Sequence, residues 1–287
     1  MYHDWNRRSF LQLLTAAACT GKPAVRAGCQ TRCYGEPPRT LGTLLPLVAD
    51  IADAGYQGFE TNYIVLGSMP DPAAARPEIE KRLPLIGLHL GVQLHLAERE
   101  EKNRAEIARV AKGTRELGGD HIMLSGAVSG HLDGDALRSG IRRKSDELIR
   151  AARVCRDSNI RLCVHNHVEE TRNDFYELRE VLANTPAGDV WLLLDIGHAG
   201  VGGANAAAFF RSHAARIAGL HVRDRIGERQ VPMGTGQVDL HGIAAAIRET
   251  GWSGWVIVEL EGTSVPGVSS SENVRLARQY LKKDMNI

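Results

Sequence analysis

Four short apolar runs in the second half of the chain each lead into a histidine or an acidic residue. They place His165, Asp195, His221 and Glu259 at their carboxyl ends. Runs of this length that are apolar on both faces are typical of parallel strands covered on both sides. Because the carboxyl ends of parallel strands meet at one rim, we expect these four side chains to lie close together.

This mixture of imidazole and carboxylate groups suits a divalent metal ion. Such ligands bind Mn²⁺, Co²⁺ or Zn²⁺ and leave coordination positions open for substrate oxygens. Taken alone, each residue also has a structural explanation: Asp195, for example, could cap the helix that follows it. Four such residues in succession at strand ends favour one metal site over four separate structural roles.

The elements that would position these residues alternate along the chain from about Ala27. Short apolar runs alternate with longer stretches of helical spacing, which is the pattern of a parallel sheet. The expected strands cover residues 27–33, 58–61, 91–96, 121–125, 161–167, 190–195, 217–224 and 255–261. The expected helices cover residues 41–54, 73–88, 101–117, 135–158, 174–183, 204–214, 239–249 and 271–282.

Eight strand–helix units predict an α/β fold, namely a single-domain (β/α)₈ TIM barrel over residues 24–287. A doubly wound open sheet is the competing architecture. That fold normally carries a Gly-rich phosphate turn after its first strand, and the Cys-Tyr-Gly-Glu-Pro-Pro of residues 33–38 is not such a turn. No shift in composition divides the chain within this range, so one domain is the simpler account.

Charge and hydropathy exclude some classes of partner. The chain has 35 Lys and Arg against 34 Asp and Glu, so its net charge of +1 provides no strong field for nucleic acid or an anionic membrane. No run approaches the roughly 20 apolar residues that a membrane-spanning helix needs. We therefore expect a small-molecule partner, no nucleic acid and no membrane span. The sequence allows a homo-oligomer without specifying one.

The five cysteines do not form a disulfide or zinc-binding pattern. They are odd in number and irregularly spaced, at positions 19, 29, 33, 155 and 163. If Cys29 and Cys33 lay on one strand, they would be about 13 Å apart at roughly 3.3 Å per residue, too far for a disulfide. We interpret them as packing residues.

The N-terminus differs from the rest of the chain. Residues 6–12, Asn-Arg-Arg-Ser-Phe-Leu-Gln, resemble a twin-arginine export motif, and a short, weakly apolar segment follows. Residues 1–23 are therefore a candidate signal segment, which predicts export to the periplasm. The alternative is a basic N-terminal extension on a cytoplasmic protein.

The chain resembles the xylose isomerase-like barrel superfamily, which contains sugar isomerases and epimerases, inosose dehydratases and apurinic endonucleases. The resemblance covers the chain from about Ala27 to its end. It rests on the segments 164–167 (Val-His-Asn-His), 194–198 (Leu-Asp-Ile-Gly-His), 220–224 (Leu-His-Val-Arg-Asp), 232–239 (Pro-Met-Gly-Thr-Gly-Gln-Val-Asp) and 258–259 (Val-Glu).

The resemblance implies that Asp195, His221 and Glu259 hold one metal ion. Relatives with the tagatose-epimerase pattern supply a fourth ligand, a glutamate, from the fifth strand. This chain has His165 at that position, and Glu170 stands five residues later. Either residue could complete the metal shell, and the sequence does not decide between them.

The resemblance also implies an enediolate mechanism, in which the metal chelates a ketone and an adjacent hydroxyl. Glu259 is the first choice as base, with Glu170 or His165 on the opposite face of the substrate. His167 would act as the acid for a leaving group or, equally, orient a metal ligand. If the proton returns to carbon, the reaction is isomerisation or epimerisation; if an oxygen leaves, it is elimination.

Four further residues are candidates for binding substrate: His198, Arg223, Glu60 and His95. Glu261 is an alternative ligand if Glu259 is not the one used. The leading hypothesis is a metal-dependent sugar or polyol isomerase or epimerase. A keto-sugar or inosose dehydratase on the same site is the close alternative. A phosphodiester nuclease, which would need more than one metal, and a non-catalytic sugar-binding barrel are the remaining alternatives.

Overall fold

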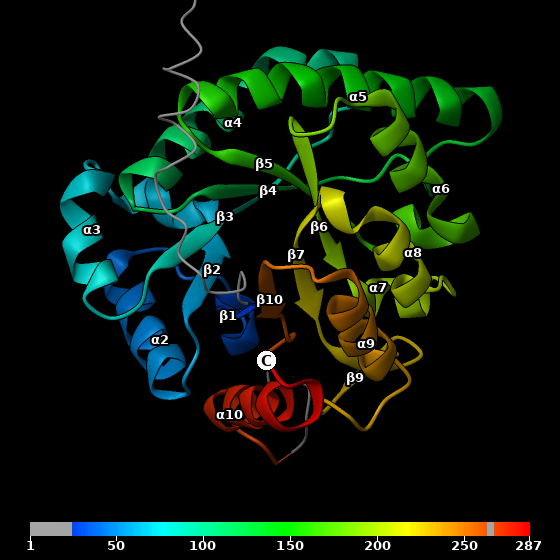
Figure 1. Ribbon diagram of the computed structural model, residues 1–287. Helices are drawn as coiled ribbons and strands as arrows, with labels where there is room; N and C mark the ends of the chain where they lie inside the picture. The colour runs from blue at the N-terminus through cyan, green and yellow to red at the C-terminus, as the bar shows by residue number, and fades with distance from the viewer. Residues whose placement is uncertain (1–24, 263–266) are drawn as a thin grey trace, which may run out of the picture.

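Eight parallel strands close into a barrel, with helices around the outside (Figure 1). The computed structural model describes residues 25–262 and 267–287, so the candidate signal segment at residues 1–23 lies outside the described residues. Neighbouring strands follow the order β1, β10, β7, β6, β5, β4, β3, β2. Their bounds are β1 Arg26–Gln30, β2 Gly58–Asn62, β3 Leu85–Gly91, β4 His121–Ser125, β5 Arg161–His165, β6 Val190–Asp195, β7 Ile217–Val222 and β10 Trp255–Val258. The predicted (β/α)₈ barrel is confirmed.

The helices cover the outer face of the strands. They are α2 Leu41–Asp53, α3 Pro72–Glu80, α4 Glu100–Glu116, α5 Gly134–Asp157, α6 Val168–Asn184, α7 Ile196–Val201, α8 Ala206–His213, α9 Leu240–Thr250 and α10 Ser270–Tyr280. A short antiparallel hairpin, β8 Asp224–Ile226 with β9 Arg229–Val231, follows β7 and was not predicted. No helix in the described ranges is both long enough and apolar enough to cross a membrane.

The third strand–helix unit differs from its prediction. The expected helix 73–88 ends at Glu80, and β3 begins at Leu85 rather than at residue 91. Pro84 accounts for the difference, because proline lacks the N–H of a helical residue and disfavours helical geometry in the residue before it. The apolar run after Pro84 is the strand, and the histidine it carries near its carboxyl end is His89.

The first strand is also shorter than predicted. It ends at Gln30, whose side chain accepts a hydrogen bond from the backbone N–H of Arg32 and begins a 3₁₀ turn over Thr31–Tyr34. Cys33 therefore folds back toward Cys29, and the two sulfur atoms lie 3.8 Å apart. The expected separation of about 13 Å required both cysteines to lie on one straight strand at roughly 3.3 Å per residue, and Cys33 lies beyond the end of β1. Both thiols are free and buried, as expected of packing residues.

Apolar side chains seal the amino end of the barrel beneath the site. Trp255 packs there with a small cluster whose other members are Ile86, Met123, Cys163, Leu193, Ala218 and Ile257. Two glycines make room for this cluster: a Cβ at Gly58 would lie 2.7 Å from the Trp255 ring, and one at Gly219 would lie 2.7 Å from Leu193 Cδ1. The barrel interior is thus packed at this end, and its polar groups collect at the other.

Gly87 allows β3 and β4 to pair closely. A Cβ added at this residue would lie 2.1 Å from the backbone oxygen of His121 on the neighbouring strand. We expect Gly87→Ala to lower the free energy of unfolding by about 2 kcal/mol or more, because the backbone of β4 would have to move. Gly67→Ala is the matched control, since a Cβ there meets nothing within 4 Å. Urea unfolding midpoints that fall equally little for both variants would contradict this account.

Candidate metal centre

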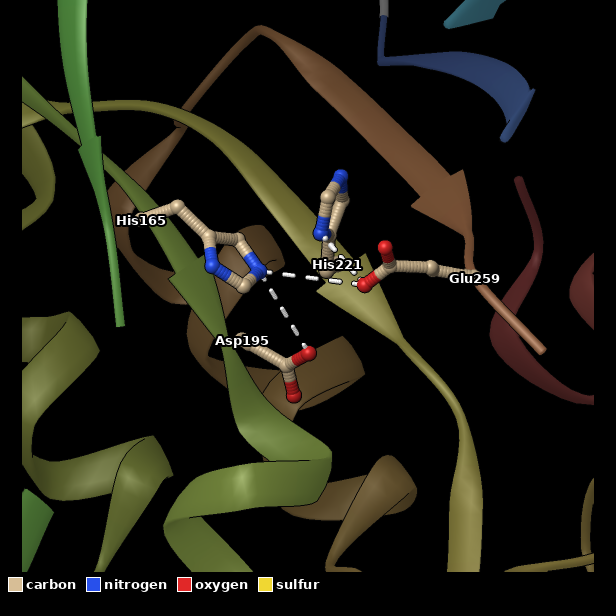
Figure 2. Close-up of side chains that lie close together, drawn as sticks. All are labelled: His165, Asp195, His221 and Glu259. Carbon is tan, nitrogen blue, oxygen red and sulfur yellow. Dashed lines mark ion pairs between the residues drawn. The ribbon is translucent and has the colours of Figure 1, made fainter. Parts of the chain in front are cut away.

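Four side chains at the carboxyl ends of the strands converge on one point. The last residues of β5 and β6 are His165 and Asp195, and the penultimate residue of β7 is His221. Glu259 directly follows β10 (Figure 2). Each offers one ligand atom, and these atoms all lie within 4.8 Å of one another. All four residues are buried. The structure therefore brings together the four residues predicted as metal ligands.

The contacts within this group fit a bound cation. The Nε2 atom of His165 lies 3.6 Å from Asp195 Oδ2 and 3.7 Å from Glu259 Oε2. His221 Nδ1 lies 2.9 Å from the same Glu259 oxygen. Both ring nitrogens of His165 are buried without a hydrogen-bond partner. Buried nitrogens normally have a partner, and a divalent ion between these groups would supply one.

The electrostatics of the site also favour a positive charge. Burial raises the pKa of Asp195, but the Arg223 guanidinium and His198 outweigh it and hold that pKa well below its usual value. For Glu259, burial is outweighed in the same way by His221 and Arg223. Both carboxylates are therefore ionised at neutral pH. Burial lowers the pKa of His221, yet Glu259 and Glu60 together raise it well above its ordinary value.

Arg223 neutralises part of this negative charge. Its guanidinium is buried and donates from Nη2 to Asp195 Oδ2 at 2.5 Å and to Glu259 Oε2. Its Nη1 donates to Glu261 Oε1 at 3.0 Å. Gly197 leaves room for the Arg223 side chain, because a Cβ at residue 197 would lie 2.2 Å from Arg223 Cγ. Arg223 lines the pocket, as a substrate contact must, and it also pairs with both metal-site carboxylates.

Glu60 lies behind His221 and does not line the pocket, although it was predicted to contact substrate. Its carboxylate is fully buried, and Oε2 lies 2.6 Å from His221 Nε2. A proton on Nε2 would be donated to Glu60, which would leave Nδ1, 2.9 Å from Glu259 Oε2, to bind a metal ion. A carboxylate in this position typically orients a metal-binding histidine and increases its basicity.

Glu170 also lies outside the four-residue group. One carboxylate oxygen is 3.2 Å from Lys144 Nζ, and the other accepts the backbone N–H of His167 at 2.8 Å. Its local role is a capping box at the start of α6. Of the two fifth-strand candidates, the structure places His165, and not Glu170, beside Asp195 and Glu259.

The third strand contributes His89, which the sequence analysis missed. His89 lines the pocket, and its ring centre is 4.9 Å from that of His165. The predicted residue, His95, lies beyond the end of β3, stacks against His131 at 6.2 Å and does not line the pocket. The signal that identifies His89 is Pro84, which marks the true start of the strand.

The four-residue group opens into a pocket of about 320 Å³. One wall consists of imidazoles, since His167 and His198 join His89 and His165 there. Other polar residues at or just beyond the ends of β1, β2 and β10 also line it: Gln30, Thr31, Arg32, Asn62 and Glu261. A pocket with these donors and acceptors suits a small ligand with several hydroxyl groups.

Two polar contacts hold the strand ends and the loops above them in place. Asn166 donates to the backbone oxygen of Asp195 at 3.0 Å and accepts from its N–H at 2.9 Å, which ties β5 to β6. The Asp224 carboxylate accepts backbone N–H groups of Gly234, Gly236 and Val238. The first contact explains the Asn of the 164–167 segment; in the 232–239 loop, a Cβ at Gly236 would lie 2.2 Å from Asp224 Oδ1, and Gly234 has a φ of 84°.

Comparison with known proteins gives the family. The family model described as xylose isomerase-like TIM barrel matches residues 48–284. The chain belongs to this family. An inosose dehydratase of Bacillus licheniformis is 25% identical over 275 residues, which cover 85% of this chain and 89% of that protein. Alignments with several other inosose dehydratases span only about half the length of those relatives.

Solved structures show the same fold. An L-ribulose 3-epimerase superposes with a TM-score of 0.79 at 16% identity, covering 91% of this chain and 95% of that one. The crystal structure of an IOLI protein with a bound zinc atom superposes with a TM-score of 0.76 at 17% identity, covering 90% of this chain and 97% of that one. The resemblance expected from the sequence motifs is confirmed at the level of fold and family.

The Glu60–His221 contact predicts the effect of one substitution on metal binding. Glu60→Gln should weaken the binding of Mn²⁺ or Zn²⁺ about 10- to 100-fold, because the imidazole loses the carboxylate that orients it. His241→Ala, which removes an exposed histidine, is the matched control and should bind metal as the wild type does. Titration calorimetry with each metal measures both. Equal affinities for Glu60→Gln and the wild type would show that Glu60 does not orient the ligand.

Proposed function

We propose that this chain is a divalent-metal-dependent lyase that removes water from a keto-polyol or keto-sugar. The observation that carries the proposal is the imidazole of His165 at the fifth-strand position. In the epimerase pattern a pair of glutamates acts on opposite faces of the sugar, whereas here Glu259 is the one member of that pair that faces the pocket. The name inosose dehydratase among the relatives supports the same class of reaction.

The metal ion would be held by His165, Asp195, His221 and Glu259. When bound, it would polarise the keto group of the substrate and stabilise the negative charge that develops on its oxygen. Mn²⁺, Co²⁺ and Zn²⁺ all suit this set of ligands.

Export through the N-terminal segment is a separate proposal, tested by sequencing the N-terminus of the protein purified from its native source.

Glu259 is the base in this proposal. Its contacts with His165, His221 and Arg223 all use Oε2, which leaves Oε1 to accept a proton from the carbon next to the keto group. His221 and Arg223 hold the pKa of Glu259 well below its usual value, so the carboxylate is ionised and able to accept this proton. A carboxylate is a sufficient base because the polarised ketone acidifies the adjacent C–H bond.

His167 is the residue placed to assist the leaving group. The C–H bond breaks toward Glu259, a C=C bond forms, and the C–O bond to the β-hydroxyl breaks. The departing oxygen takes up the proton that Glu259 removed and leaves as water, while a hydrogen bond from His167 stabilises the negative charge that develops on it. His167 lines the pocket, and burial lowers the pKa of its imidazole, so the ring is neutral at pH 7 and donates one N–H toward this oxygen.

Epimerisation is the second candidate, because His165 also faces Glu259 at 3.7 Å and an imidazole can return a proton to carbon. The products separate the two reactions. With a metal-loaded enzyme and a keto-inositol in deuterated water, a lyase forms an unsaturated or diketo product that has lost one water. An epimerase instead returns a sugar of unchanged mass apart from deuterium at the exchanged carbon.

We expect the enzyme to remove water from the keto-inositol. NMR and the absorbance of the conjugated product measure this reaction. Glu259→Gln should lower kcat by about 10²- to 10⁴-fold, the usual contribution of a general base. Glu36→Gln, which alters an exposed carboxylate outside the pocket, is the matched control and should keep the wild-type rate. Deuterium exchange without water loss would overturn the lyase proposal in favour of the epimerase.

A substitution at His165 tests the observation on which the proposal rests. His165→Glu supplies the fifth-strand carboxylate of the epimerase pattern while keeping a metal ligand at that position. We expect this variant to exchange the substrate proton with solvent faster, relative to water loss, than the wild type does. An unchanged ratio of exchange to elimination would mean that the residue at position 165 does not select the reaction.

A further inference from the structure

A buried lysine on α5 pairs with two buried glutamates on α6. Lys144 Nζ lies 3.2 Å from Glu170 Oε1 and 2.7 Å from Glu177 Oε1. The lysine is 2% exposed, and both glutamates are fully buried. Charges so deeply buried remain ionised only when they are well paired. We call these three residues the Lys144 cluster.

The two glutamates lie on either side of a left-handed turn inside α6. Asn173, Asp174 and Phe175 have φ angles of 51°, 55° and 61°. Three successive residues other than glycine in this region are strained, and the phenylalanine most of all. Phe175 is buried and stacks on Phe209 at 4.1 Å. Lys144 thus binds one residue before the turn and one after it, which holds the strained conformation in place.

Each glutamate of the cluster also fixes the backbone of a loop at the pocket end of the barrel. Glu177 accepts the N–H of Val128 at 3.0 Å and that of Ser129 at 2.7 Å, in the loop between β4 and α5. Glu170 accepts the N–H of His167 at 2.8 Å. The cluster therefore links α5, α6 and two loops through direct hydrogen bonds.

The loop between β5 and α6, which contains His167, forms part of the pocket wall. The ring of His167 lies 5.1 Å from that of His165 and 5.2 Å from that of His198. A continuous path runs from Lys144 through Glu170 to the backbone of His167, whose side chain faces the substrate pocket. The path does not include any of the four residues of the metal group.

We propose that Lys144 is a positioning residue, which holds the imidazole of His167 in the pocket by binding Glu170 across the strained turn. Its effect on the reaction rests on the proposed function, in which His167 assists the leaving group. Its effect on the backbone does not depend on that function. Without the ammonium group, two buried carboxylates would lack a counter-ion, and the turn between them would open.

Lys144→Met tests the proposal, because methionine keeps much of the side-chain volume and removes the charge. We expect backbone amides of residues 166–175 and 126–131 to exchange with deuterated water at least 10-fold faster, while those of α9 exchange as in the wild type. Zinc affinity should stay within about threefold, since the metal group is not touched. With a keto-inositol, kcat should fall at least 10-fold and KM change less than threefold.

Arg216→Met is the matched control, because Arg216, which directly precedes β7, contacts the far end of α6. Arg216 donates to Leu182 O, Val190 O and Thr185 Oγ1, near the amino end of β6. This variant should have a lower melting temperature than the wild type. Its amide exchange at residues 166–175 and its kcat should equal those of the wild type. Lys144→Arg, which restores a cation, should recover part of the protection lost in Lys144→Met.

Two results would overturn the proposal. One is unchanged amide exchange at residues 166–175 in Lys144→Met; the other is faster exchange spread equally over α9, which would indicate general destabilisation. If Lys144→Met does not fold, Glu177→Gln replaces it, with the same expected exchange pattern. A wild type that loses no water from the keto-inositol would contradict the proposed function alone, because the exchange measurements do not depend on turnover.

Discussion

The site depends on the pairing of one buried arginine with two buried carboxylates. Asp195 and Glu259 are held close together away from water, and two such charges would repel each other strongly without a cation between them. Arg223 binds both, through the same oxygen atoms that face His165. This arrangement keeps both carboxylates ionised and directs their remaining capacity toward a metal ion and a substrate.

The barrel brings the residues of this pairing together and leaves room for them. Parallel strands bring residues far apart in sequence to one rim, so that β5, β6, β7 and β10 each supply one group. Small residues fit around them: Gly197 makes room for Arg223, and Gly58 for the indole that seals the barrel below. Side chains outside the pocket support the metal group from behind: Glu60 contacts the imidazole of His221, and Asn166 binds the backbone of Asp195.

The strand ends were predictable because each is a short apolar run followed by a polar residue. The same reasoning failed in the third unit, where hydrophobic spacing outweighed the helix-breaking effect of Pro84 and selected His95 in place of His89. It also failed for the first strand, because the bond from Gln30 to Arg32 that ends it depends on a side-chain orientation that the apolar pattern does not reveal.

Partners that come from distant segments could not be inferred from local pattern. Glu60 and Glu170 both looked like groups for the substrate site, but one orients His221 and the other binds Lys144. Nothing in the sequence around Asn173 indicates three left-handed residues in a row, since none of them is glycine. These features arise from tertiary contacts that override local preference.

The most direct test of the central claim is a crystal structure of the protein with Zn²⁺, measured at the zinc absorption edge. The account predicts one anomalous peak, with His165, Asp195, His221 and Glu259 as ligands at about 2.0–2.2 Å. A crystal with the same four side chains in place and no peak among them, or with the ion bound elsewhere in the chain, would contradict it.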